Sequence, residues 1–201
     1  MNNIIAVFGG SFNPPHYAHF LFAEEIINEI NDIKKVLFLP VSSKYEKQNL
    51  LSNEHRYNML KLVCDEDDRF DVSNLEHIQE RQLNTYETLE LLQEKYPGYE
   101  LIFIIGTDNL KELYWWGNID LLLAKYKILV IERGEDKFED IIETQDFLKK
   151  YRNSFIRYNQ NVRTNLSSTY IRNEIYKNKD FKYLVPHKVY EYIKENNLYR
   201  G

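Results

Sequence analysis

Short apolar segments separated by amphipathic ones restrict most strongly how this chain can fold. Four segments are almost wholly apolar: Ile4–Phe8, Val36–Leu39, Leu101–Ile105 and Lys127–Ile131. Such runs are typical of strands that are buried on both faces of a sheet. Apolar residues at helical spacing predict helices between them, at Tyr17–Ile30, Ser52–Val63 and Thr85–Tyr96. The alternation predicts an α/β fold, a Rossmann-like doubly wound parallel sheet with helices on both faces.

The remaining segments are shorter or more polar. Alternation in Phe70–Leu75 predicts a further strand. The last third of the chain predicts a polar helix, a short extended piece and two more helices, at Phe138–Tyr151, Ser154–Tyr158, Thr169–Lys177 and His187–Glu195. The sequence contains no Gly/Ser-rich linker, low-complexity tract or repeat. We therefore expect one domain over residues 1–201, with a small helical C-terminal subregion from about residue 160 to 201.

The composition is that of a globular protein. Hydrophobic residues make up 43% of the 201 residues, charged residues make up 28%, and the formal net charge is -5. This charge argues against a dedicated nucleic-acid-binding surface. The single cysteine, Cys64, excludes an internal disulfide and a multi-cysteine zinc site. Because Cys64 lies in an apolar helical run, we expect it to be a small buried side chain.

The sequence shows no sign of membrane insertion or export. No apolar stretch approaches the length needed to cross a bilayer. The N-terminal segment MNNIIAVFGG lacks a basic start and a small-residue cleavage site, so a signal peptide is not predicted. We expect a cytoplasmic protein.

The segment GGSFNPPHYAH follows the first predicted strand. Gly9 and Gly10 would let the chain turn sharply and let a ligand approach the backbone closely. His16 and His19 are three residues apart at the start of a predicted helix, an end that attracts anions. There the imidazoles could bind phosphate oxygens and stabilise developing charge. Taken alone, the histidines fit better as surface residues, and zinc binding is less favoured because no nearby carboxylate supports it.

The segment SSTYIR, at residues 167–172, opens one of the C-terminal helices. Ser167, Ser168 and Thr169 offer hydroxyl groups at a helix N-terminus. Arg172 follows about one turn later, and a guanidinium beside hydroxyls predicts a second phosphate-binding site. A capped helix whose arginine faces solvent fits this segment equally well.

The segment GTD follows the predicted strand Leu101–Ile105. Asp108 could cap the next helix, which is the commonest use of such a residue, or accept hydrogen bonds from a sugar or base. The pair Trp115 and Trp116 is usually core, but a tryptophan at this edge could stack on a heterocycle. All three segments are expected beside the carboxyl ends of strands, where ligands bind in doubly wound sheets.

Two of these segments together resemble a known family. GGSFNPPHYAH resembles the GG(T/S)FDPxHxGH signature of the HIGH-type nucleotidyltransferases, and SSTYIR resembles their SSTxIR element. The whole chain, from about Ile4 to Arg200, looks like the bacterial nicotinate-nucleotide adenylyltransferases. LIFIIGTDNL, LYWWGNIDLLL, NTYETLELL and YIKENNLYRG all fall where that family has similar segments.

The resemblance implies roles for individual residues. Residues that would contact ATP and its phosphates are Gly9, Gly10, Ser11, Phe12, His16 and His19. Gly106 and Asp108 would bind the adenosine, and Ser168, Thr169 and Arg172 would bind the β- and γ-phosphates. Thr85 and Tyr86 would line the nicotinate pocket, with Trp116 stacked on the pyridine ring. His16, His19 and Arg172 would be the catalytic residues, and Mg²⁺ would be held mainly by the ATP phosphates rather than by a protein metal site.

Two positions depart from the family pattern. Ala18 replaces the glycine of HxGH, a change small enough to leave the histidines in place. In the loop PVSSKYEKQN, Val41 stands where the family has an asparagine followed by PPHK or PPHR. Only Lys44 and Lys47 remain there to bind a phosphate, so the acceptor is less well defined than ATP.

The resemblance implies adenylyl transfer from ATP to nicotinate mononucleotide, with release of pyrophosphate. Alternatives are transfer to nicotinamide mononucleotide or phosphopantetheine, a cytidylyl transfer, or a nucleotide-binding regulatory module without activity. A redox enzyme using NAD is disfavoured because no G-x-G-x-x-G follows a strand. ATP and a mononucleotide are thus the expected partners, without nucleic acid or membrane. A homo-oligomer is compatible with the sequence.

Overall fold

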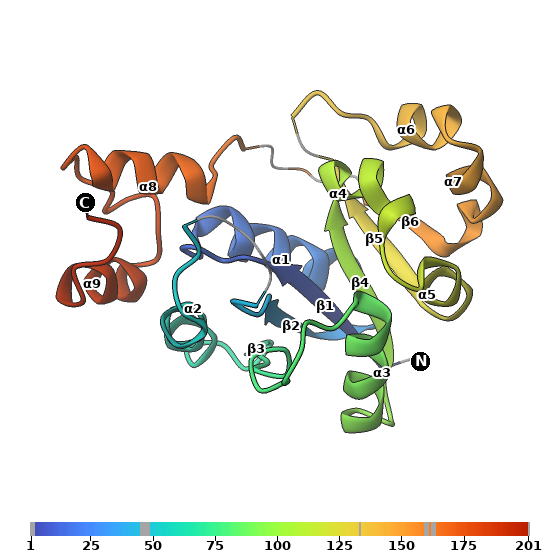
Figure 1. Cartoon of the computed structure of the whole chain (residues 1–201), viewed down its shortest axis with the longest axis horizontal. Coiled ribbons are helices and arrows are strands. Elements are labelled where there is room, and N and C mark those ends of the chain that lie inside the picture. The colour runs from blue at the N-terminus through green and yellow to red at the C-terminus, as the bar shows by residue number, and fades with distance from the viewer. Residues whose placement is uncertain (1–2, 45–48, 133, 159–160, 162–163, 201) are drawn as a thin grey trace.

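One parallel sheet forms the centre of the protein. A computed structural model describes residues 3–44, 49–132, 134–158, 161 and 164–200. Within these ranges the six strands are β1 (Ile4–Gly10), β2 (Ile33–Pro40), β3 (Phe70–Val72), β4 (Glu100–Gly106), β5 (Lys127–Ile131) and β6 (Phe155–Tyr158). They are all parallel and lie in the order β3-β2-β1-β4-β5-β6 (Figure 1). The strand order reverses between β1 and β4, and the predicted doubly wound α/β fold is confirmed.

The helices of the described residues follow the strands in the alternating order that the sequence predicts. The α-helices are α1 (Tyr17–Glu29), α2 (Asn53–Cys64), α3 (Thr85–Lys95), α4 (Thr107–Glu112), α5 (Ile119–Lys125), α6 (Phe138–Thr144), α7 (Asp146–Lys150), α8 (Ser168–Tyr176) and α9 (His187–Glu195). Two short 3₁₀ helices are η1 (Leu113–Trp115) and η2 (Arg152–Ser154).

Alternate residues of β1 supply the two layers of the core. Ile5 and Val7 pack with the buried side chains of α3 and α5 on one face. Ala6 and Phe8 pack with those of α1 and α2 on the other face. Both sets are buried, which explains why β1 is apolar at every position instead of alternating with polar residues. Helices on both faces of the sheet are therefore confirmed.

The structure corrects several predicted elements. The helix expected over Phe138–Tyr151 is two helices, because Gln145 between them has an extended backbone (φ -127°, ψ 110°). β3 ends at Val72 rather than Leu75, and residues 75–78 form a turn. No bounds were predicted for the short helices α4 and α5, since six or seven residues give too few turns for a periodic pattern.

The helical C-terminal part has a small core of its own. Ile171 and Ile175 of α8 pack with Val189 and Ile193 of α9, and Met59 of α2 belongs to the same cluster. Figure 1 places α8 and α9 beside α2, at one side of the sheet. Because this cluster is joined to the rest of the protein through α2, we propose that the chain forms one domain.

Two further expectations can be compared with the structure. Cys64 is buried, and burial raises the pKa of its thiol to about 12, so the predicted role as a small apolar side chain is confirmed. Of the helices in the described ranges, none combines the length and the apolar character needed to cross a bilayer.

Candidate active site

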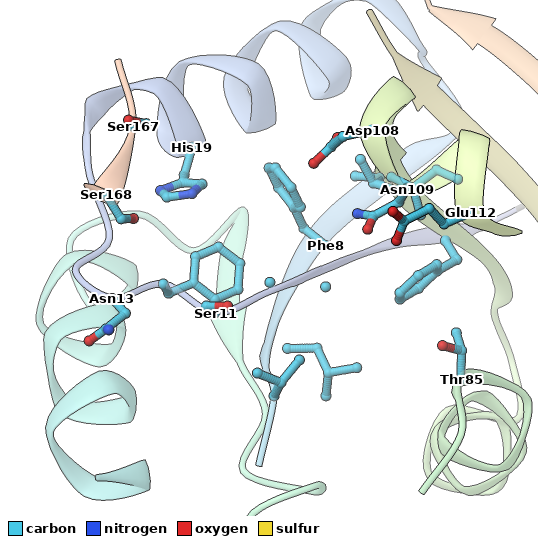
Figure 2. Close-up of a pocket in the computed structure, with 18 of the residues that line it drawn as sticks. Phe8, Ser11, Asn13, His19, Thr85, Asp108, Asn109, Glu112, Ser167 and Ser168 are labelled. Carbon is cyan, nitrogen blue, oxygen red and sulfur yellow. The ribbon is translucent and has the colours of Figure 1, made fainter. Parts of the chain in front are cut away.

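A cavity of about 1170 Å³ lies at the carboxyl ends of the strands. Gly9 and Gly10 of β1, Leu39 of β2 and Ile105 of β4 all line it. It is therefore located where the strand order reverses, the usual ligand site of such sheets. Figure 2 shows His19 and Ser168 on one side of the cavity, and Thr85, Asp108 and Glu112 on the other.

His16 and His19 come together at the start of α1. His16 is the N-cap residue and His19 is the third residue of the helix. Their rings stack, with centroids 3.7 Å apart and an interplanar angle of 26°. Both line the cavity and are buried, with exposed fractions of 4% and 9%. The interpretation of the pair, taken alone, as surface residues is thus wrong, because His19 packs against the rings of Phe8 and Phe12 and His16 stacks on His19.

Neighbouring groups fix the orientation of His19. The backbone N–H of His16 donates to Nδ1 of His19 over 3.1 Å. In the neutral ring the proton is therefore on Nε2, which makes Nε2 a hydrogen-bond donor. The rings of Phe12 and Phe8 pack edge-on against the imidazole, at centroid distances of 4.9 and 6.1 Å. His19 can therefore present a donor without a side-chain rearrangement.

The start of α8 is bonded to the loop that follows β1. The Ser168 hydroxyl donates to the carbonyl of Pro14 over 2.8 Å. Arg172 donates to the carbonyl of Asn13 over 2.8 Å and to the hydroxyl of Thr169 over 3.2 Å. The residues of this segment that line the cavity are Ser167, Ser168, Thr169 and Arg172, and Ser167 also caps the helix. Segments more than 150 residues apart thus form one wall (|i−j| = 154 for the Ser168 contact).

The segment after β4 forms another part of the wall. Gly106 is the N-cap of α4 and does not line the cavity. Asp108 does line it, and lies inside the first turn of α4, so of its two alternatives the role as helix cap is excluded. Asn109 and Glu112 line the cavity too, and sequence reasoning missed them. Their spacing of three residues would have placed them on one helix face, but no bounds were predicted for α4.

The residues expected at the acceptor end are only partly brought together. Thr85 and Trp116 line the cavity. Tyr86 does not line it, and packs instead against Tyr126 with ring centroids 6.5 Å apart. Lys44 is exposed, donates to the carbonyl of Gln79 and does not line the cavity. Lys47 lies outside the described residues.

Glycine at position 9 is linked to the placement of Trp116. A Cβ atom on Gly9 would lie 2.6 Å from the Phe103 ring, closer than real contacts allow. Phe103 in turn packs edge-on against Trp116, with centroids 6.2 Å apart. The missing side chain at Gly9 therefore leaves space for the aromatic pair behind the cavity wall.

Polar residues around the start of α3 were not predicted as cavity residues. Asn84 and Glu87 form a capping box, in which each side chain bonds the backbone N–H of the other over 3.0 Å. The Arg81 guanidinium is bonded to Glu87 and lowers the pKa of that carboxyl to about 2. Asn84, Glu87 and Arg81 all line the cavity. The sequence signal was available in N-x-x-E, which is a capping-box pattern.

Glu76 is a buried carboxylate in the cavity wall. It accepts hydrogen bonds from the Thr88 hydroxyl over 3.0 Å and from the backbone N–H of Ser42 over 3.4 Å. It is 8% exposed, and burial raises its pKa. Glu76 therefore joins α3 to the loop that follows β2, and no sequence pattern marked it.

Similar proteins identify the family of this chain. The cytidylyltransferase-like family matches residues 7–174. A probable nicotinate-nucleotide adenylyltransferase of Carboxydothermus hydrogenoformans is 34% identical over 98% of each chain. One of Clostridium tetani is 32% identical over 97% of this chain and 98% of its own. The chain belongs to the nicotinate-nucleotide adenylyltransferase family.

Solved structures agree with the fold. The nicotinic acid mononucleotide adenylyltransferase of Plasmodium falciparum, complexed with NaAD, matches with a TM-score of 0.81 and 23% identity over 98% of both chains. The same protein complexed with APC gives a TM-score of 0.80. The resemblance drawn from GGSFNPPHYAH and SSTYIR is confirmed, and this protein is a nucleotidyltransferase of the family.

Proposed function

We propose that this protein transfers the adenylyl group of ATP to nicotinate mononucleotide, giving deamido-NAD and pyrophosphate in NAD biosynthesis. The observation that carries the proposal is the make-up of the cavity. One side has the two stacked histidines, the start of α8 and Arg172. The other side has the start of α3 and, from the segment after η1, Trp116. Such a cavity can bind the phosphates of one nucleotide beside the aromatic ring of another.

On the ATP side, we assign the phosphates to the wall formed by the starts of α1 and α8. Helix N-termini attract anions through their N–H groups and dipole. His16, His19 and Arg172 would be the catalytic residues, because each can stabilise charge on the departing pyrophosphate. The proposed ATP contacts, besides these, are Gly9, Gly10, Ser11, Phe12, Asp108, Ser168 and Thr169. Gly106 would act indirectly, by starting α4.

The chemistry requires little from the protein. The acceptor phosphate has a second pKa of about 6, so it is largely dianionic at neutral pH and needs no general base. One of its oxygens forms a bond to the α-phosphorus of ATP as the bond to the bridging oxygen of the β-phosphate breaks. Pyrophosphate leaves with that electron pair. The donor on Nε2 of His19 and the Arg172 guanidinium stabilise this charge, and the site aligns the two reactants.

On the acceptor side, the start of α3 favours an anionic ring substituent. Thr85 and Tyr86 are the first two residues of α3, and their N–H groups precede the first intrahelical bond. We propose that these amides bind the nicotinate carboxylate, while Trp116 stacks on the pyridine ring. The side chain of Tyr86 would have no direct role. Lys44 would reach the acceptor phosphate only by leaving the carbonyl of Gln79, and Lys47 stays a sequence prediction.

Magnesium fits this cavity as a companion of ATP. Across the described ranges, no group of three or more His, Cys, Asp and Glu side chains is placed to hold a metal ion. We propose that Mg²⁺ is held by the ATP phosphates and water, the usual arrangement for this ion. Bound in this way, it would neutralise part of the phosphate charge.

One observation favours a second acceptor. The Glu76 carboxylate lies in the cavity wall and would repel a carboxylate placed close to it, whereas it could accept from an amide. Nicotinamide mononucleotide is therefore the second candidate. We further propose a cytoplasmic location. A homo-oligomer is compatible with the sequence and stays untested.

A pyrophosphate-release assay tests these assignments. ATP and CTP are each offered with nicotinate mononucleotide, nicotinamide mononucleotide and phosphopantetheine. We expect the highest kcat/KM for ATP with nicotinate mononucleotide. A higher kcat/KM with the nicotinamide compound would assign the second acceptor. Turnover only with CTP or phosphopantetheine would contradict the proposal.

A further inference from the structure

Arg56 is a fully buried cation outside the cavity wall. It lies on α2, and its exposed fraction is 0%. Its three side-chain nitrogens donate in three directions. Nε donates to the carbonyl of Leu51 over 3.0 Å, Nη1 to the carbonyl of Ser11 over 3.1 Å, and Nη2 to Oδ1 of Asn53 over 2.8 Å. Burying a charge is costly, and the three acceptors offset part of this cost only while their segments stay in place around Arg56.

Asn53 extends the contact of Arg56 to the loop that follows β2. The same Oδ1 atom of Asn53 accepts the backbone N–H of Ser43 over 2.6 Å. A chain of hydrogen bonds therefore runs from the carbonyl of Ser11 through Arg56 and Asn53 to Ser43. Ser11 belongs to the loop after β1, which we assigned to ATP. Ser43 belongs to the loop after β2, where the acceptor is expected.

We propose that Arg56 is a positioning residue. It holds the loop of Ser11 (the ATP loop) and the loop of Ser43 (the acceptor loop) in the relative position that in-line attack requires. This inference rests on the proposed function. Transfer needs the acceptor phosphate and the α-phosphorus to meet in one geometry, and a misplacement of about 1 Å can cost about 10²-fold in rate. A guanidinium suits the task because its planar fork holds well-separated donors in fixed directions, whereas the three donors of an ammonium rotate about a single nitrogen.

The charge state of Arg56 is compatible with this role. Burial lowers the pKa of the guanidinium to about 10, so it remains protonated at neutral pH. The nearby Glu76 carboxylate favours the charged form. The hydrogen bonds to Ser11 and Asn53 therefore keep a charged donor, which strengthens them.

The sharpest test removes only the hydrogen bonds through which Arg56 is connected to the acceptor loop, those of Oδ1 of Asn53. Asn53→Ala removes Oδ1 but leaves Arg56 bonded to Ser11, and Ser52 still caps α2. We expect KM for the acceptor to rise about tenfold, the size of a lost bond to a charged group, with less than about a twofold change in KM for ATP. Asn53→Asp should restore KM, because both partners of Oδ1 are donors. A purely structural role would change the melting temperature without separating the two KM values.

A second variant disrupts the hydrogen bonds of Arg56 to both Ser11 and Asn53. Arg56→Lys keeps the positive charge but cannot reach three acceptors, so we expect kcat to fall about 10²-fold. Asn58→Ala is the matched control, since Asn58 lies on the same helix and bonds Tyr192 instead of a substrate loop. It should leave both KM values unchanged. Thermal unfolding of each variant is measured alongside.

The outcomes separate this inference from the proposed function. If the wild type transfers adenylyl groups but Asn53→Ala keeps both KM values, or Asn53→Asp fails to restore them, the inference is wrong. If the wild type transfers to no acceptor, the proposed function fails. The inference is then decided by the affinity for a non-hydrolysable ATP analogue, measured by calorimetry. A loss of about tenfold in Arg56→Lys would support it, and an unchanged affinity would overturn it.

Discussion

The two ends of the cavity are built in different ways. At the ATP end, side chains from two sequence motifs meet and are held by neighbouring groups, as His19 is by His16 and Arg172 is by Asn13. At the acceptor end, the groups proposed to bind the ring are the backbone amides at the start of α3 and the half-buried side chain of Trp116. Two of the side chains expected there, Tyr86 and Lys44, do not line the cavity.

This difference explains why one end was easier to assign than the other. A phosphate needs donors of fixed position, which specific residue types supply and which leave a mark in the sequence. A planar ring with a carboxylate can be bound by a stacked aromatic ring and by main-chain N–H groups, which nearly any sequence provides.

The largest effect is expected from the two histidines. His19→Ala and His16→Ala should each lower kcat by about 10²- to 10³-fold, because each removes a group that stabilises charge in the transition state. Steady-state pyrophosphate release with both substrates saturating measures the change. His55→Ala is the control, since His55 forms a hydrogen bond with Tyr192 away from the cavity. This variant should keep the kcat of the wild type. Near-normal turnover in both His16 and His19 variants would remove their catalytic role.

A smaller effect is expected at the acceptor end. Trp116→Ala should raise KM for the pyridine nucleotide by about tenfold and leave KM for ATP nearly unchanged, because only ring stacking is lost. Tyr86→Phe is the comparison, and its KM should stay at the wild-type value since the ring of Tyr86 packs against Tyr126. An unaltered KM in Trp116→Ala would show that Trp116 only supports Phe103.

The smallest effect concerns stability at acid pH. His77 lies beside the acceptor loop, and burial lowers its pKa to about 4, with help from the charge of Arg56. In the unfolded chain it titrates near 6.5, so the unfolded state binds more protons between pH 6.5 and 4. Its contribution to stability is present above pH 6.5 and is lost as the pH falls to 4.

Comparison with a non-titrating variant isolates this contribution. In denaturant unfolding between pH 7 and 4, the free energy of unfolding should decrease less for His77→Gln than for the wild type. The difference should be about 1 to 2 kcal/mol, because partial exposure reduces the full effect of the pKa shift. Glu76 changes stability in the opposite direction, since burial raises its pKa, but it does so in both proteins. Parallel curves would show that His77 titrates normally in the folded state.

Local patterns in the sequence determined much of this protein. The run Lys127–Ile131 became β5 with the same bounds, and the helix predicted over Ser52–Val63 became α2, Asn53–Cys64. The segments GGSFNPPHYAH and SSTYIR were visible because each is a short, continuous pattern that resembles a family motif. Each of these features depends on neighbours within one or two turns of the chain, and local periodicity reports such neighbours well.

Tertiary structure decided the features that depend on contacts between distant segments. It buried His16 and His19, turned Tyr86 toward Tyr126, and placed Arg56 between the loops of Ser11 and Ser43. A helical pattern shows which face of α2 is apolar, but it cannot show that a charged residue on that helix will meet a carbonyl 45 residues away (|i−j| = 45). The pairing of β1 with β2 brings those segments together, so the burial of Arg56 depends on contacts between segments that are distant in the sequence.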